Sequence, residues 1–345
     1  MDKKTLREKF TQYYLARRSE EFIKTFDVHR SWSQIQDKIA IRRRNRSIRL
    51  TLVASTAVAA LIVIGFFVQD SLPKSVPSSS LFADQVKSGA RLIMESGEII
   101  VLTDSTEVID RSVFVEKKGK IPTLVYDSIK NGENQLQTLE VSRGGTYRLE
   151  LSDGTRVWLN AETRLSYPKM FGRQREVYLT GEAYFEVAKK SDQPFIVHVH
   201  NSSVEVLGTC FCVIDYPDQP LQTVLAEGQV RVVSTKDSVI LRPNQKAEIS
   251  LEGTIGVTSV DAAVYVSWIS GIYEFVDMPL QTVAMYIARM YNVDVRFEEE
   301  SLKDVRLTGA IYCHENLGYM LNVLERATDI CFSRDGDMII ISKSK

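Results

Sequence analysis

The sequence lacks the short motifs that identify the common enzyme classes. Its 345 residues contain no G-x-S-x-G, H-E-x-x-H, P-loop or dinucleotide-binding pattern, and no C-x-x-C pair of a zinc site. Cysteine and histidine are scarce, with 4 residues each. Their absence argues against an enzyme without excluding one, because paired carboxylates leave no short signature. We therefore predict that the chain is not an enzyme and holds neither a metal ion nor a cofactor.

Acidic residues outnumber basic ones outside the amino-terminal region. Residues 1–49 hold 14 Lys and Arg against 6 Asp and Glu, a net charge of +8, and the remainder holds 29 against 38, a net charge of −9. A basic head suggests nucleic acid, but five of its arginines lie together at positions 42–49, beside an uncharged stretch. Membrane topology and anionic lipid explain such a cluster. We therefore expect no direct contact with nucleic acid.

The stretch from Leu50 to Val68 contains no charged residue. As a helix it would measure about 28 Å, close to the roughly 30 Å thickness of the hydrocarbon core of a bilayer. The arginines on its amino-terminal side place residues 1–49 in the cytoplasm by the positive-inside rule. The sequence thus predicts one transmembrane helix at 50–68 in the inner membrane, with a periplasmic carboxyl terminus. A buried core helix is the alternative.

Apolar residues recur at helical spacing in residues 1–49 and predict three short amphipathic helices. So small a head buries little surface and is expected to be marginal alone. Its apolar stripe is therefore a candidate docking surface for a partner, the alternative being a self-contained helical hairpin. The aromatic residues that we expect to bind the partner are Tyr13, Tyr14, Phe22, Phe26 and Trp32.

Short alternating runs follow, separated by Gly, Asp and Pro turn signals. We expect a linker with juxtamembrane strands at 69–135 and an all-β domain, a sandwich or an irregular β-solenoid, at 136–266. One hairpin starts at Tyr147 and turns at Ser152-Asp153-Gly154, and a fainter copy starts at Ala90. Two further separate strands are predicted at 177–179 and 183–187.

The pattern changes after Trp268. Residues 267–345 predict a two-fold strand-helix-strand arrangement, a small α+β module. Its helices are expected at 280–291 and 316–327, and its strands at 272–275, 293–297, 305–311, 330–333 and 338–342. The predicted fold class is therefore a multidomain membrane protein with a short all-α head, one transmembrane helix, an all-β domain and a carboxyl-terminal α+β module.

The few cysteines and histidines allow limited chemistry. Cys210 and Cys212 lie two residues apart on one strand face, a geometry that suits free thiols better than a mutual bridge. Cys313 and Cys331 lie in neighbouring parts of the α+β module and are a candidate disulfide in an oxidising compartment. Two histidines at 198 and 200 share a strand face, but no third metal ligand is evident.

Four ordered motifs lie between Arg143 and Val187: R-G-G, L-x-D-G-T-x-V-W-L-N-A, Y-P and V-x-L-x-G-E-A-Y-F-x-V. This block resembles the core of the FecR family of transmembrane anti-sigma factors. The terminal module is similar to the STN-like module that ends many FecR-like proteins. The resemblance implies that the head holds an extracytoplasmic-function (ECF) sigma factor in the cytoplasm. It also implies that the periplasmic part receives a signal from the signalling domain of an outer-membrane TonB-dependent transducer.

The resemblance further implies a candidate self-cleavage site at Gly208-Thr209, because some relatives split at a Gly-Thr bond in this region. A Thr hydroxyl can attack the preceding carbonyl in an N-to-O acyl shift, and an ordinary strand turn is the alternative. Two competing functions stay open: a periplasmic glycan-binding or envelope scaffold protein, and an envelope hydrolase with clustered carboxylates. A neighbouring sigma-factor gene would favour the anti-sigma interpretation, and neighbouring polymer-export genes would favour the scaffold.

Overall fold

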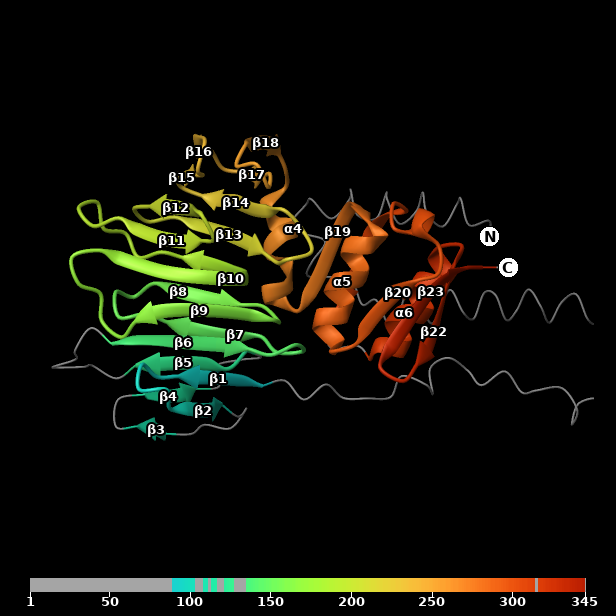
Figure 1. Cartoon of the computed structure of the whole chain (residues 1–345), viewed down its shortest axis with the longest axis horizontal. Coiled ribbons are helices and arrows are strands. Elements are labelled where there is room, and N and C mark those ends of the chain that lie inside the picture. Colours follow the sequence, from blue (N-terminus) through green and yellow to red (C-terminus); the bar gives the residue numbers. More distant parts are fainter. Residues whose placement is uncertain are drawn as a thin grey trace, which may run out of the picture. The chain divides into compact units, whose positions relative to one another are not determined.

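Alternation of apolar and polar residues produces most of the structure. The computed structural model describes residues 89–102, 108–110, 113–116, 121–126, 135–313 and 316–344. On strand β7 (Tyr147–Glu150), Tyr147 and Leu149 are buried, whereas Glu150 is exposed. The same period of two recurs on most strands of the region before residue 260. The 18 strands described there are joined in one hydrogen-bonded network (Figure 1).

These strands form two sheets. The order in the first sheet is β2 (Ile99–Leu102), β1 (Ala90–Ile93), β6 (Leu136–Val141), β9 (Thr163–Pro168), β10 (Arg175–Glu186), β11 (Phe195–Val199), β12 (Ser202–Val206), β15 (Val230–Val233) and β16 (Ser238–Leu241). The order in the second is β3 (Val108–Asp110), β4 (Val113–Glu116), β5 (Thr123–Tyr126), β7, β8 (Arg156–Leu159), β10, β13 (Cys210–Asp215), β14 (Leu221–Glu227), β17 (Gln245–Ile249) and β18 (Ile255–Ser259).

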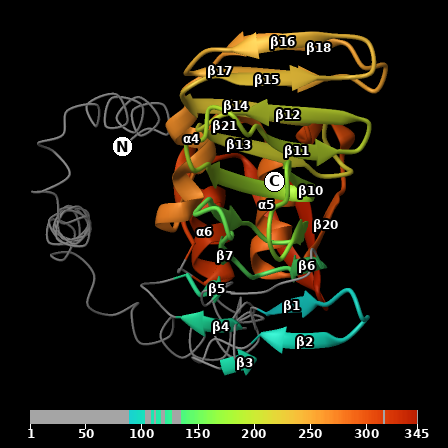
Figure 2. The same cartoon turned by 90° about the vertical axis from the view of Figure 1, so that its left-hand side faces the viewer.

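The inner faces of the two sheets share one core. Leu139 and Val197 of the first sheet belong to the same buried cluster as Phe185 and Phe211 of the second. The chain alternates between the sheets and advances along the stack, as the colour change from β1 to β18 shows in Figure 1. Strands β16 and β18 therefore end the two sheets on the same side (Figure 2). The β-domain combines the two faces of a sandwich with the progressive winding of a solenoid.

Strand β10 belongs to both sheets. Its first half pairs with β9 and β11, and from Gly181 onward it pairs with β8 and β13. Gly181 has a φ of +101°, and a Cβ there would lie 2.7 Å from the Glu162 carbonyl oxygen. Only glycine accommodates this crossing easily. The prediction of separate strands at 177–179 and 183–187 is therefore wrong, because one continuous strand changes sheets between them.

The carboxyl-terminal module follows two short helices, α4 (Ala262–Val266) and the 3-10 helix η3 (Ser267–Ser270). It contains β19 (Ile272–Pro279), α5 (Leu280–Tyr291), β20 (Asp294–Phe297), the 3-10 helix η4 (Glu300–Leu302), β21 (Arg306–Tyr312), α6 (Leu317–Ala327), β22 (Ile330–Asp335) and β23 (Met338–Lys343). Strands β19 and β21 form one sheet, and β20, β23 and β22 form another. The predicted helices and strands of this module are confirmed within a few residues.

The predicted fold class, however, is wrong. The described residues are mostly β-sheet, and their three α-helices contain 5, 12 and 11 residues. The longest would measure about 18 Å, well short of a bilayer. No helix in the described ranges has the length and apolar character needed to cross a membrane. The predicted all-α head at 1–49 and transmembrane helix at 50–68 lie outside the described residues.

Candidate functional site

The α+β module packs on the outer face of the second sheet. On β13, Phe211 and Val213 face the core of the sandwich, and Cys212 and Ile214, which alternate with them, belong to a second buried cluster. That cluster also contains Trp268 and most apolar residues of the module. Cys212 and Ile214 are thus buried by the module rather than by their own domain. The interface between the two parts is the candidate functional site, because it buries side chains from both of them.

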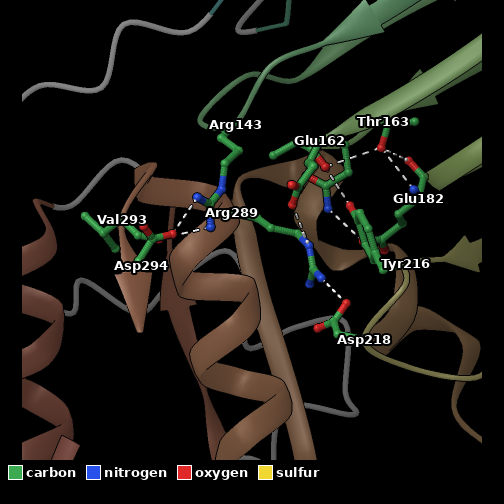
Figure 3. A network of polar contacts seen from close by, with 11 residues as sticks. Arg143, Glu162, Thr163, Glu182, Tyr216, Asp218, Arg289, Val293 and Asp294 are labelled. Carbon is green, nitrogen blue, oxygen red and sulfur yellow. Dashed lines mark hydrogen bonds and ion pairs between the residues drawn. The ribbon is translucent and has the colours of Figure 1, made fainter. Parts of the chain in front are cut away.

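Arg289 on α5 is the central charge of this interface. Its side chain is only 6% exposed, and its Nε donates to Glu162 Oε2 at 3.2 Å. Its Nη2 donates to Asp218 Oδ1, and its guanidinium carbon lies 3.7 Å from the centre of the Tyr216 ring (Figure 3). The β-domain therefore supplies two carboxylates and an aromatic face to one cation of the module, and such contacts strengthen when water is excluded.

A third carboxylate lies deeper. Glu182 on β10 is 1% exposed and accepts a hydrogen bond from Asn160 Nδ2 at 2.8 Å. Burial raises the pKa of Glu182 to about 7, while the Asn160 hydrogen bond and the charge of Arg289 oppose the rise. Its protonation state therefore changes near neutral pH. The Cys212 thiol also donates to Glu182 Oε1 at 4.0 Å. The arrangement joins two modules electrostatically.

Thr163 and Tyr216 fix the backbone around these charges. Thr163 Oγ1 accepts a hydrogen bond from the Glu182 backbone N–H at 2.9 Å. The Tyr216 hydroxyl donates to the Ala161 carbonyl at 2.7 Å. Between them, Glu162 adopts a φ of +58°, an unusual conformation for a residue with a side chain. This geometry orients the Glu162 carboxylate towards Arg289 (Figure 3).

The R-G-G motif forms a second bridge to the module. Arg143 Nη1 donates to Asp294 Oδ1 at 2.9 Å, and its Nη2 donates to the Val293 carbonyl at 3.0 Å. The Gly144 N–H donates to the Arg289 carbonyl at 2.8 Å, near the carboxyl end of α5. Carbonyls at a helix end otherwise lack partners and carry partial negative charge. The motif therefore anchors the end of α5 to the β-domain.

The D-G-T motif, Asp153 to Thr155, makes contacts within the β-domain itself. Asp153 accepts from the Thr155 N–H at 2.9 Å and from its hydroxyl at 2.8 Å. Its Oδ2 also accepts from Arg175 Nη1 at 2.8 Å, and both side chains of this ion pair are almost fully buried. Arg175 further donates to the carbonyls of Ala188 and Gln193. The motif thus links the β7–β8 turn to β10 and to the loop after it.

The candidate self-cleavage bond lies just before β13. A Cβ at Gly208 would lie 2.7 Å from Lys189 Cα, so close packing alone requires a glycine there. The buried Thr209 hydroxyl donates to the Gln229 carbonyl at 3.0 Å and would have to leave this acceptor to attack the Gly208 carbonyl.

Self-cleavage at this bond stays a prediction. If it occurs, mass spectrometry of the purified chain will reveal a new amino terminus at Thr209 that is absent from Thr209→Ala. An intact chain after prolonged incubation contradicts it.

The other predicted site residues are not brought together. Cys313 and Cys331, like Cys210 and Cys212, are free thiols in this structure, so the candidate disulfide is not formed here. The two histidines have separate acidic partners, Glu176 at 3.3 Å from His198 and Asp215 at 2.9 Å from His200. No cluster of three potential metal ligands occurs within the described ranges. The head residues Tyr13, Tyr14, Phe22, Phe26 and Trp32 lie outside these ranges.

Sequence reasoning missed Arg289. The apolar stripe of α5 contains Leu280, Val283, Ile287 and Tyr291, which pack within the module. Arg289 follows Ile287 by two positions and lies on the opposite side of the helix, the side that amphipathic patterns assign to solvent. Its burial depends on the β-domain, and no local pattern signals that contact.

Comparison with known proteins agrees with this two-part architecture. The family model described as FecR protein matches residues 137–231, and the model described as FecR, C-terminal, matches residues 272–341. No curated protein matches the chain. Two crystal structures of a proposed anti-sigma factor from Parabacteroides distasonis ATCC 8503, at 2.50 and 1.65 Å, are similar to it.

Each of these structures has 29% sequence identity to the chain and a TM-score of 0.57. The first covers 61% of this chain and 100% of its own, and the second covers 60% and 99%. The matches to the two family models occur in the order in which the structure places the β-domain and the module. The chain therefore belongs to the FecR family.

Proposed function

We propose that the chain is an anti-sigma factor that sequesters an ECF sigma factor through residues 1–49. The observation that carries this proposal is the similarity, at 29% identity over a whole solved chain, to a proposed anti-sigma factor. That similarity covers 61% of this chain. The basic, aromatic-rich sequence of residues 1–49 supports a docking role, because an apolar stripe without a core of its own is stabilised by a partner.

The second part of the proposal concerns the signal. Residues 267–345 receive it from the signalling domain of a TonB-dependent transducer, and the interface around Arg289 transmits it to the β-domain. Helix α5 belongs to the module and contacts the β-domain through Arg289, which supports this route. The proposed location is the inner membrane, with residues 1–49 in the cytoplasm and the carboxyl terminus in the periplasm. The five arginines at positions 42–49 support that orientation.

The sigma-factor assignment is tested with the full chain and the sigma factor encoded beside its gene. The double variant Phe26→Ala, Trp32→Ala is expected to weaken binding by at least about 100-fold, because aromatic anchors at interface hot spots contribute on the order of 2 kcal/mol or more each. The matched control is Thr25→Ala, Ser33→Ala in the same segment. Undiminished binding of the aromatic double variant in a titration would contradict the assignment.

A further inference from the structure

The polar cluster at the centre of the interface combines the Arg289 guanidinium with three carboxylates. Glu162 and Asp218 bind the guanidinium directly, and both are partly exposed to water (Figure 3). Glu182 lies deeper and is only 1% exposed. When Glu182 is ionised, the cluster therefore holds three negative charges against one positive charge. Protonation of Glu182 halves this excess of negative charge and removes the charge that is most costly to bury.

Glu182 is faced by groups from both parts of the chain. From the β-domain, Asn160 Nδ2 and the Cys212 thiol donate to its two carboxyl oxygens. The groups that interact with it electrostatically from the other elements packed against it are Tyr216 after β13, Trp268 on η3, Tyr273 on β19, and Tyr286 and Arg289 on α5. Burial raises the pKa of the three tyrosine hydroxyls and of the Cys212 thiol, so these groups stay neutral near neutral pH.

The docked module keeps water away from Glu182. The neighbouring Ala183 faces the core of the sandwich, so Glu182 lies on the outer face of the second sheet, where it pairs with Ile214 of β13. Ile214 is buried in one cluster with aromatic residues of η3 and of the module, namely Trp268, Tyr273 and Tyr286. If the module moved off this face, water would reach the Glu182 carboxylate, and the ionised form would no longer be disfavoured by burial.

We propose that ionisation of Glu182 shifts the α+β module from a docked to a released position, so that the β-domain holds the module more tightly at acidic than at alkaline pH. This inference goes beyond the proposed function, because it holds whatever partners the chain binds.

The direction of the effect follows from the pKa of Glu182 in the two positions. Burial under the docked module raises this pKa to about 7, whereas in the released position it returns towards the ordinary value of 4.5. The docked state therefore binds the proton more tightly. Docking is favoured most below about pH 4.5 and weakens as the pH rises through 7. Between pH 6 and pH 8 the docking equilibrium constant is expected to fall about 10-fold.

The thiol of Cys212 reports release, because its side chain is fully buried in the cluster that the module covers. The other three cysteines are replaced by serine, which leaves Cys212 as the single thiol of the full chain. Its rate of reaction with a dithiodipyridine reagent is divided by the rate for the same chain unfolded in urea at the same pH, which corrects for the titration of the thiol. This ratio is expected to rise about 10-fold from pH 6 to pH 8 and to stay constant in Glu182→Gln.

Glu186→Gln is the matched control. Glu186 lies on the same strand, β10, and makes an ion pair with Arg156 outside the cluster around Arg289. This variant is expected to keep the rise in the labelling ratio between the two pH values. A ratio that does not change with pH when Glu182 is present overturns the proposal. A rise that persists in Glu182→Gln, or that is also lost in Glu186→Gln, overturns it as well, because the pH dependence would not come from Glu182.

A second measurement uses the wild-type chain and needs no substitution. The Gly144 N–H donates across the interface to the Arg289 carbonyl, whereas the Leu151 N–H donates to the Thr155 carbonyl within the β-domain. Protection of the Gly144 amide from hydrogen exchange, relative to its intrinsic rate at each pH, is expected to fall about 10-fold from pH 6 to pH 8. Leu151 is expected to retain its protection.

Two outcomes of the exchange measurement contradict the proposal. Protection of Gly144 that does not change with pH would mean that Glu182 does not control docking. An equal loss of protection at Gly144 and Leu151 would mean that the β-domain itself unfolds, instead of the module separating from it.

Discussion

Arg175→Met is expected to lower the free energy of unfolding of the β-domain by about 3–5 kcal/mol. The guanidinium is fully buried beside Asp153 and donates to two backbone carbonyls besides. Its removal leaves a buried carboxylate without its ion-pair partner and buried acceptors without a donor. Urea unfolding followed by intrinsic tryptophan fluorescence measures the loss.

The matched control for this prediction is Arg91→Met. Arg91 makes an ion pair with Glu140 at 3.1 Å on the outer face of the first sheet, where its side chain is 48% exposed. Such a pair is screened by water, so its loss is expected to cost less than about 1 kcal/mol. A loss for Arg175→Met no larger than that for Arg91→Met would show that the buried pair does not hold the β7–β8 turn in place.

Arg289→Met is expected to destabilise the contact between the two modules by about 2–3 kcal/mol at pH 8. The value lies below that for Arg175 because Glu162 and Asp218 are partly exposed and can be hydrated after the change. This destabilisation is expected to depend on pH, because Arg289 lies close to the titrating carboxyl group of Glu182. Its pKa is raised from 4.5 to about 7, so the unfolded chain releases this proton at a lower pH than the folded chain.

Stability from this group is therefore fully present below about pH 4.5 and is lost as the pH rises through 7, by roughly 3 kcal/mol. The positive charge of Arg289 stabilises the ionised form of Glu182, so it reduces this loss of stability only at a pH where Glu182 is ionised. The penalty of Arg289→Met is thus expected to be about 1 kcal/mol smaller at pH 5.5 than at pH 8. Unfolding curves at the two pH values measure this difference.

Glu182→Gln tests whether the pH dependence comes from the Glu182 carboxyl group. In the Arg289→Met background it is expected to restore stability at pH 8 and to have little effect at pH 5.5, because glutamine resembles the protonated acid. Arg326→Met, at an exposed position on α6, is the control for loss of a positive charge from the module. An Arg289→Met penalty that is equal at both pH values and unchanged by Glu182→Gln would show that Glu182 does not interact energetically with Arg289.

Features that depend on near neighbours can be predicted from the order of the residues alone. The turn at Ser152-Asp153-Gly154 follows from residues that favour tight turns, and the hairpin that it joins follows from a period of two. The stripe of α5 likewise follows from helical spacing, and the helix forms over 280–291 as expected. The ordered motifs between Arg143 and Val187 indicated the family, which the matches to both family models confirm.

Contacts between residues far apart in the chain depend on how the folded elements pack. The passage of β10 between sheets depends on the close approach of Gly181 to Glu162, and the burial of Arg175 depends on a turn more than 20 residues earlier. Arg289 lies 127 positions from Glu162 and 71 from Asp218. Periodicity reports which side of an element is apolar, but not which distant surface covers its polar side. The interface around Arg289 is therefore a product of how the two parts pack.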